Sequence, residues 1–107
     1  MKHDEQDLER QCCALAREQG WAAWKNEANG NKGIPDASFL HPSGVFFMVE
    51  FKNGKISRIS REQQIWAQKF ARSVFFCHNL EEFLRVIKEQ TDRVNNLSKN
   101  YFTPSKT

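Results

Sequence analysis

The chain has 107 residues and a formal net charge of +3, and its hydrophobic (39%) and charged (27%) fractions are typical of a folded globular domain. This length supports one hydrophobic core and excludes two independent domains. No apolar stretch approaches membrane-spanning length, and residues 1–5 are too polar to open a signal peptide, so we expect no membrane association. Three cysteines, two of them adjacent, suggest no disulfide framework and favour a reducing cytoplasm.

The N-terminal half predicts one helix followed by three strands. Apolar residues at helical spacing predict a helix over residues 4–19, and Gly20 is a suitable stop signal. Short strands are expected over 21–25 and 36–40, on either side of a glycine-containing loop. A turn over 41–44 precedes the β-branched and aromatic run 45–51, which predicts a hairpin. This hairpin brings Asp36 beside Glu50.

The C-terminal half predicts a helix, a strand and a last helix. After a polar loop over 53–59, Ser60 and Gln63 have the spacing of a capping box. A short strand over 73–77 follows, and Asn79 can cap the last helix. The helical crossover favours parallel pairing of the last strand. Residues 93–107 are polar and contain no acid, so we expect a loosely ordered basic tail after a domain over residues 1–92. The three tryptophans fall within regular elements and are expected in the core.

Candidate metal-binding residues lie at the end of the third predicted strand. Side chains alternate along a strand, so Glu50 and Lys52 project to the same side, where Asp36 is also expected. Paired carboxylates are hard oxygen ligands that suit Mg²⁺ or Mn²⁺, and a bound metal lowers the pKa of a water molecule enough to make it a nucleophile. The alternatives are a surface ion pair between Glu50 and Lys52 and a turn-capping role for Asp36.

Positive charge is concentrated directly after this strand. Between Lys52 and Arg72 there are six basic residues and one acid, Glu62. Clustered positive charge beside a carboxylate site is suited to holding a polyanion, which favours nucleic acid as the partner over a solvated face without a ligand. The candidate nucleic-acid contacts are Lys55, Arg58, Arg61 and Lys69.

The order of these motifs resembles that of a known superfamily. The segments that carry the resemblance are Gly33-Ile34-Pro35-Asp36, Val49-Glu50-Phe51-Lys52 and Ser60-Arg61-Glu62-Gln63. Together they resemble the PD-(D/E)XK nucleases, and within them the small stand-alone VRR-NUC domains of phages and bacteria, over about residues 5–88. The resemblance implies an α/β fold with a restriction-endonuclease-like αβββαβ core, in which helices flank a central mixed sheet, plus a C-terminal helix.

The resemblance also implies roles for individual residues. Asp36, Glu50 and the backbone carbonyl of Phe51 look like ligands of a divalent cation, Mg²⁺ with Mn²⁺ as a substitute. Lys52 looks like the lysine that orients or activates the attacking water. Gln63 resembles the glutamine that reaches into the site, although the capping box also explains it. Glu5 resembles the first-helix glutamate that completes the acidic cluster, and Glu9, one turn further, competes for that role.

These roles imply a metal-dependent DNA endonuclease, with branched DNA such as a Holliday junction as a candidate substrate. Symmetric cleavage of two strands by so small a chain implies a homodimer. Two alternatives remain open: a nucleic-acid-binding module that keeps this fold without turnover, and a phage-encoded protein whose basic face binds host factors.

Overall fold

The computed structural model describes residues 4–27, 30, 32–52 and 59–101. The order of elements predicted from the sequence is confirmed: a helix, three strands, a helix, a strand and a helix. Their bounds are α1 Asp4–Glu18, β1 Ala22–Lys25, β2 Ala37–Leu40, β3 Phe46–Phe51, α2 Arg61–Lys69, β4 Val74–Cys77 and α3 Leu80–Tyr101.

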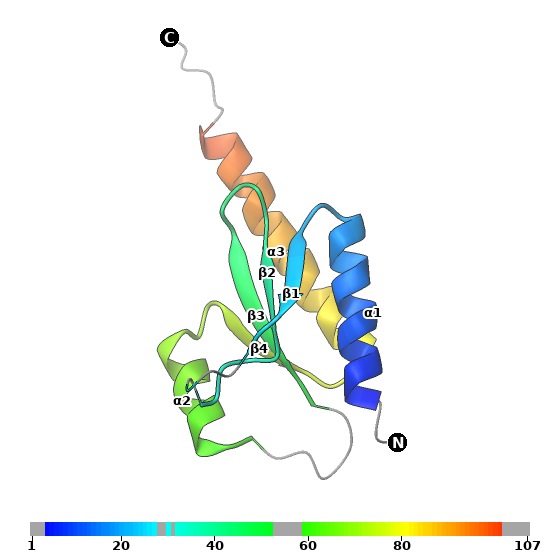
Figure 1. The fold of residues 1–107 in the computed structure, drawn as a ribbon. Helices are drawn as coiled ribbons and strands as arrows, with labels where there is room; N and C mark the ends of the chain where they lie inside the picture. Colours follow the sequence, from blue (N-terminus) through cyan, green and yellow to red (C-terminus); the bar gives the residue numbers. More distant parts are fainter. Residues whose placement is uncertain (1–3, 28–29, 31, 53–58, 102–107) are drawn as a thin grey trace.

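The strands form one mixed sheet in the order β1-β2-β3-β4. The first two pairings are antiparallel and the pairing of β3 with β4 is parallel, as the helical crossover between them predicts. Figure 1 shows α1 and α3 on one side of the sheet and α2 on the other. The sheet is therefore covered by two helices on one face and by one short helix on the opposite face.

The main core lies between the sheet and the pair α1 and α3. Alternate residues of β2 and β3 point into it, and Phe39, Phe47, Phe51 and Phe83 are fully buried. The rings of Phe39 and Phe47 stack with centroids 4.7 Å apart. The three cysteines are buried free thiols, as expected, and burial raises the pKa of Cys12 and of Cys77 to about 12.

Helix termini follow the signals in the sequence. The Ser60 hydroxyl accepts a hydrogen bond from the Gln63 N–H, and the Gln63 side chain accepts one from the Ser60 N–H, which completes the predicted capping box. The Asn79 side chain accepts from the Glu82 N–H at 2.8 Å and caps α3. Gly20 directly follows the last turn of α1 with a φ of 95°, a conformation that favours glycine.

Two sequence predictions about the periphery are wrong. The expected loose tail from residue 93 is helical through Tyr101, because Val94 is buried and Leu97 packs against the core, which continues the apolar stripe of α3. Residues 102–107 lie outside the described part. All three tryptophans were expected in the core, but only Trp21 is buried there. Trp24 is 41% exposed because it lies on the sheet face away from α1 and α3. Trp66 lies on α2, which contains no buried residue. Among the described residues, no helix is long and apolar enough to cross a membrane.

Candidate active site

The two predicted metal-binding carboxylates are brought together at one end of the sheet. Ala37 pairs with Val49 in the antiparallel ladder of β2 and β3. Asp36 directly precedes Ala37 and Glu50 directly follows Val49, so the two acids lie opposite each other as the hairpin predicts. Asp36 also contributes to the raised pKa of Glu50 through its negative charge, which shows that the two groups are electrostatically coupled.

Asp36 is held by hydrogen bonds to backbone groups on either side. Its Oδ2 accepts from the Phe51 N–H at 2.8 Å, which extends the ladder by one side-chain bond beyond the last paired residues. The Asp36 carbonyl accepts from the Asn26 N–H at 2.8 Å, and the Asn26 side-chain amide donates to the Pro35 carbonyl at 2.9 Å. The Asn26 side chain in turn accepts from the Ser38 hydroxyl at 2.8 Å. Asn26 thus fixes the backbone on both sides of Asp36.

Glu50 is a buried carboxylate with two side-chain donors. Only 7% of Glu50 and 8% of Lys52 are exposed. The Lys52 Nζ lies 3.5 Å from Glu50 Oε2, which confirms that both side chains project to the same side of β3. The pKa of Glu50 is raised to about 7: burial is the largest cause, the negative charge of Asp36 adds to it, and Lys52 opposes it. This is a buried, coupled pair and not the surface ion pair considered as an alternative.

Gln63 connects helix α2 to this carboxylate. Its Nε2 donates to Glu50 Oε2 at 2.6 Å, while its Oε1 accepts from the Ser60 N–H at 3.0 Å. Because the capping box occupies the amide oxygen, the amide NH₂ is directed at Glu50. One end of the Gln63 amide therefore takes part in the helix cap, and the other end contacts Glu50.

The loop that precedes Asp36 packs closely against α2. Gly33 has a φ of 85°, and a Cβ atom at this position would overlap the backbone of Glu62 in the first turn of α2. The indole Nε1 of Trp66 donates to the Lys32 carbonyl at 3.1 Å. These contacts set the position of α2 relative to β2 and so help to place Gln63 beside Glu50.

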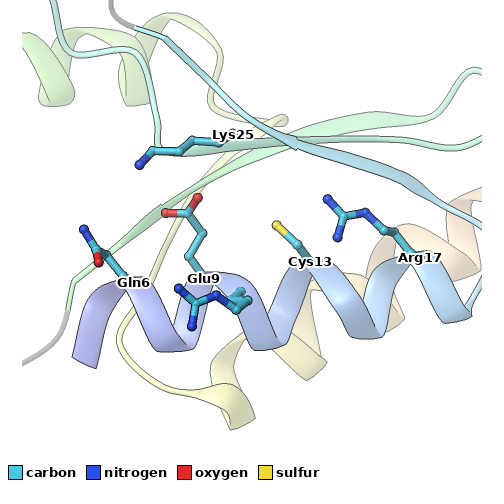
Figure 2. Close-up of a pocket in the computed structure, with 6 residues that line it drawn as sticks. Gln6, Glu9, Cys13, Arg17 and Lys25 are labelled. Carbon is cyan, nitrogen blue, oxygen red and sulfur yellow. The ribbon is translucent and has the colours of Figure 1, made fainter. Parts of the chain in front are cut away.

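Helix α1 contributes Glu9 to the surroundings of the site. Burial raises the pKa of Glu9, the nearby Asp36 raises it further, and Lys25 and Arg10 oppose the change. Figure 2 shows the Glu9 carboxylate pointing away from α1 toward Lys25 on β1. Glu5 lies in the first turn of α1, and its side chain is outside the described part of the structure.

The residues at this site fit a magnesium-type ion held by few protein ligands. Among the described residues, no three acids, histidines or cysteines are grouped closely enough to form a metal site by themselves. Asp36 and Glu50 nevertheless form a coupled carboxylate pair whose mutual repulsion a cation would relieve. Mg²⁺ commonly binds through one or two carboxylates and keeps several waters, so the chemistry of this carboxylate pair is compatible with such an ion.

The structure describes two of the four predicted nucleic-acid contacts. Arg61 and Lys69 lie exposed at the first and last positions of α2. Lys55 and Arg58 lie outside the described residues. Lys52, counted with the basic cluster in the sequence, is buried beside Glu50 and does not belong to an exposed basic surface.

Comparison with known proteins identifies the architecture. No protein-family model matches the sequence, and no curated protein is significantly similar to it. Among solved structures, one described as a VRR_NUC domain is 21% identical and superposes with a TM-score of 0.69. The match covers 78% of this chain and 94% of that chain. This chain has the fold of a VRR_NUC domain. The resemblance in the motifs is thus confirmed at the level of the α/β, restriction-endonuclease-like fold, and Asp36, Glu50 and Lys52 occupy one end of the sheet of this VRR_NUC fold.

Proposed function

We propose that this chain is a divalent-metal-dependent nuclease that hydrolyses phosphodiester bonds in DNA. One observation carries the proposal: a coupled carboxylate pair and a buried lysine, Asp36, Glu50 and Lys52, converge at one end of the sheet in a fold shared with a VRR_NUC domain. Buried carboxylates with a raised pKa, such as Glu50, concentrate at functional sites, because a buried charge destabilises a protein unless it serves a function.

The roles of the side chains follow from their surroundings. When bound, Mg²⁺ would supply a water molecule of lowered pKa and positive charge for the phosphate. Asp36 and Glu50 would hold the ion together with the Phe51 carbonyl, and the Phe51 N–H keeps Asp36 in position. Lys52 supplies positive charge beside Glu50, where it stabilises negative charge that develops on the phosphate oxygens.

Gln63 and Glu9 complete the proposed site. Gln63 orients the Glu50 carboxylate through its amide N–H, and Glu9 is the first-helix acid that acts with Asp36. Glu9 is a candidate for this role because the negative charge of Asp36 raises its pKa; the side chain of Glu5, the other candidate, lies outside the described part of the structure.

The finer proposal is a structure-selective endonuclease that acts on branched DNA as a homodimer in the cytoplasm. Arg61 and Lys69 on the exposed side of α2 are available for the phosphate backbone beside the site. Two copies related by a twofold axis would present two such sites to a symmetric junction. Light scattering on the protein alone and with junction DNA gives the stoichiometry, and a monomer in both samples contradicts this part of the proposal.

Cleavage assays test the proposed function directly. Purified protein is incubated with labelled junction, flap and linear duplex DNA, with Mg²⁺, with Mn²⁺ or with a chelator. We expect metal-dependent products that Lys52→Ala and Asp36→Asn reduce by about 10²–10⁴-fold. Lys88→Ala, which removes an exposed lysine from α3, is the matched control and is expected to cleave normally.

A binding module without turnover is the competing function. The observation that favours it is that the described residues contain no ready-made group of three metal-binding side chains. Tight DNA binding without product under any metal condition supports this alternative and overturns the nuclease proposal. Products that persist in Lys52→Ala and Asp36→Asn overturn the assignment of the site.

A further inference from the structure

A charged cleft lies between α1 and β1, next to the candidate active site. It has a volume of about 320 Å³ and is lined by Gln6, Glu9, Arg10, Cys13, Arg17 and Lys25. Pockets that enclose whole small molecules usually measure about 300–1,000 Å³, so this cleft is at the small end of that range. Figure 2 shows Lys25 extending over Glu9, with Gln6 and Arg17 on either side along α1. Its dimensions suit a small charged group better than a complete cofactor.

The lining is dominated by positive charge. Three of its six residues are cations, and Glu9 is its one acid. Arg17 is held in place because its Nη2 donates to the Ala23 carbonyl at 2.8 Å. Arg10 is a surface cation with 76% side-chain exposure, and it pairs with Asp7 at 3.3 Å. A positioned guanidinium and a lysine on opposite walls form a suitable cradle for an oxyanion.

The cleft adjoins the carboxylate pair. Lys25 pairs in register with Ala37, the residue directly after Asp36. Glu9 belongs to the lining of the cleft and is also coupled to Asp36. The basic residues of α2 lie on the opposite side of the sheet (Figure 1). The cleft therefore provides positive charge on the face of the sheet opposite to α2.

We propose that this cleft is a phosphate subsite, which binds a backbone phosphate of the DNA strand adjacent to the phosphate at Asp36 and Glu50. The proposal rests on the proposed function, since it takes the same strand as its ligand. Lys25 and Arg17 hold the phosphate oxygens from opposite walls, and the Gln6 amide is placed to donate a further hydrogen bond. The negative charge of Glu9 repels the phosphate unless a cation bound at the site neutralises the Glu9 charge.

Opposite effects of two substitutions in one cleft provide the test. Binding of a fluorescent duplex is measured by anisotropy over a series of salt concentrations, with chelator present, so that cleavage and metal do not contribute. Lys25→Gln is expected to weaken binding several-fold and to reduce the slope of log K against log salt by about 0.9, the value for one lost phosphate contact. Glu9→Gln is expected to tighten binding. Lys88→Gln, on α3, is the control for the loss of one exposed positive charge.

The outcomes separate this inference from the proposed function. If Lys25→Gln and Lys88→Gln have equal affinities and salt slopes, or if the wild type does not bind DNA, the subsite is wrong. If the opposite shifts appear but no substrate is cleaved under any metal condition, the subsite stands and the nuclease proposal fails. Thermal unfolding of each variant checks that the fold is intact. Arg17→Gln, at an exposed position of α1, is the second variant should Lys25→Gln unfold. It is expected to weaken binding in the same direction, and control-level binding overturns the subsite.

Discussion

Glu50→Gln is expected to stabilise the metal-free protein above neutral pH while abolishing cleavage. The substitution keeps the size of the side chain and removes a negative charge that is buried beside Asp36. Burial is the largest cause of the raised pKa of Glu50, and the attraction of Lys52 does not compensate for it. A residue that costs stability in the absence of its ligand is typical of a functional site.

The pH dependence follows from the difference between the folded and unfolded chains. Below a pH of about 4.5, Glu50 is protonated in both states and behaves like a glutamine. Between 4.5 and about 7 the unfolded chain loses this proton while the folded chain keeps it, so the wild type becomes less stable as the pH rises. At about 1.4 kcal/mol for each pKa unit, the difference between 4.5 and about 7 corresponds to about 3 kcal/mol, reached above pH 7. Lys52 loses a charged partner in the variant, so the net gain is expected to be about 1–3 kcal/mol.

Urea unfolding at several pH values, with chelator present, measures this difference. The free energy of unfolding of Glu50→Gln minus that of the wild type is expected to be smallest near pH 4.5 and largest above pH 7. Glu89→Gln, which removes the same charge from an exposed position on α3, is the control. If Glu50→Gln lowers stability equally at every pH, Glu50 is a structural hydrogen-bond acceptor and the electrostatic argument fails.

Three further substitutions test the surroundings of the pair. Gln63→Glu keeps the acceptor for the helix cap but replaces the donor to Glu50 with a negative charge. We therefore expect lower stability above neutral pH, weaker cleavage and a pH profile shifted upward, and an unchanged profile limits Gln63 to capping. Glu9→Gln is expected to reduce metal-dependent cleavage more than Glu5→Gln does. If a cleavage assay shows the larger loss for Glu5→Gln, Glu5 is the acid of α1 that acts at the site. Gly33→Ala is expected to lower the free energy of unfolding by at least about 1–2 kcal/mol, because a positive φ and overlap with α2 both oppose a Cβ atom; urea denaturation with no loss contradicts that packing.

The parts of the site that follow from local rules were predictable from the sequence. Alternation along β3 places Glu50 and Lys52 on one side, the hairpin brings Asp36 opposite them, and the capping-box spacing identifies Gln63. Each inference needs only neighbours in the chain or one turn between paired strands.

Features that depend on how elements dock were not predictable in the same way. Asn26 fixes the backbone around Asp36 through hydrogen bonds to Pro35 and Asp36. The sequence does not identify these partners, because an asparagine in a loop shows only that a donor and an acceptor are present. Glu5 and Glu9 lie one turn apart on the same face of α1, so the choice between them depends on the position of the site along the helix. Cys13, one turn after Glu9, is buried, which directs this face of α1 toward the sheet.

The end of α3 illustrates a different difficulty. The stripe continues through Ile87, Gln90, Val94 and Leu97 at helical spacing, so a signal exists in the sequence. Polar composition after residue 92 obscures it, and Gln90 interrupts the apolar pattern although it is only 3% exposed. The side-chain Oε1 of Gln90 accepts a hydrogen bond from the Arg93 guanidinium at 2.8 Å. This bond explains how a polar side chain is accommodated in the stripe.

The contacts of α2 connect the site to the stability of the fold. This helix contains no buried residue, and Ile65 and Phe70 are among its exposed apolar side chains. Its specific polar attachments include the bond from Gln63 to Glu50 and the bond from Trp66 to the loop before Asp36. A helix with little hydrophobic burial depends more than the others on such directional contacts. The first attachment ends on Glu50 and the second on the loop that precedes Asp36, so α2 is bound to both segments that carry the carboxylate pair.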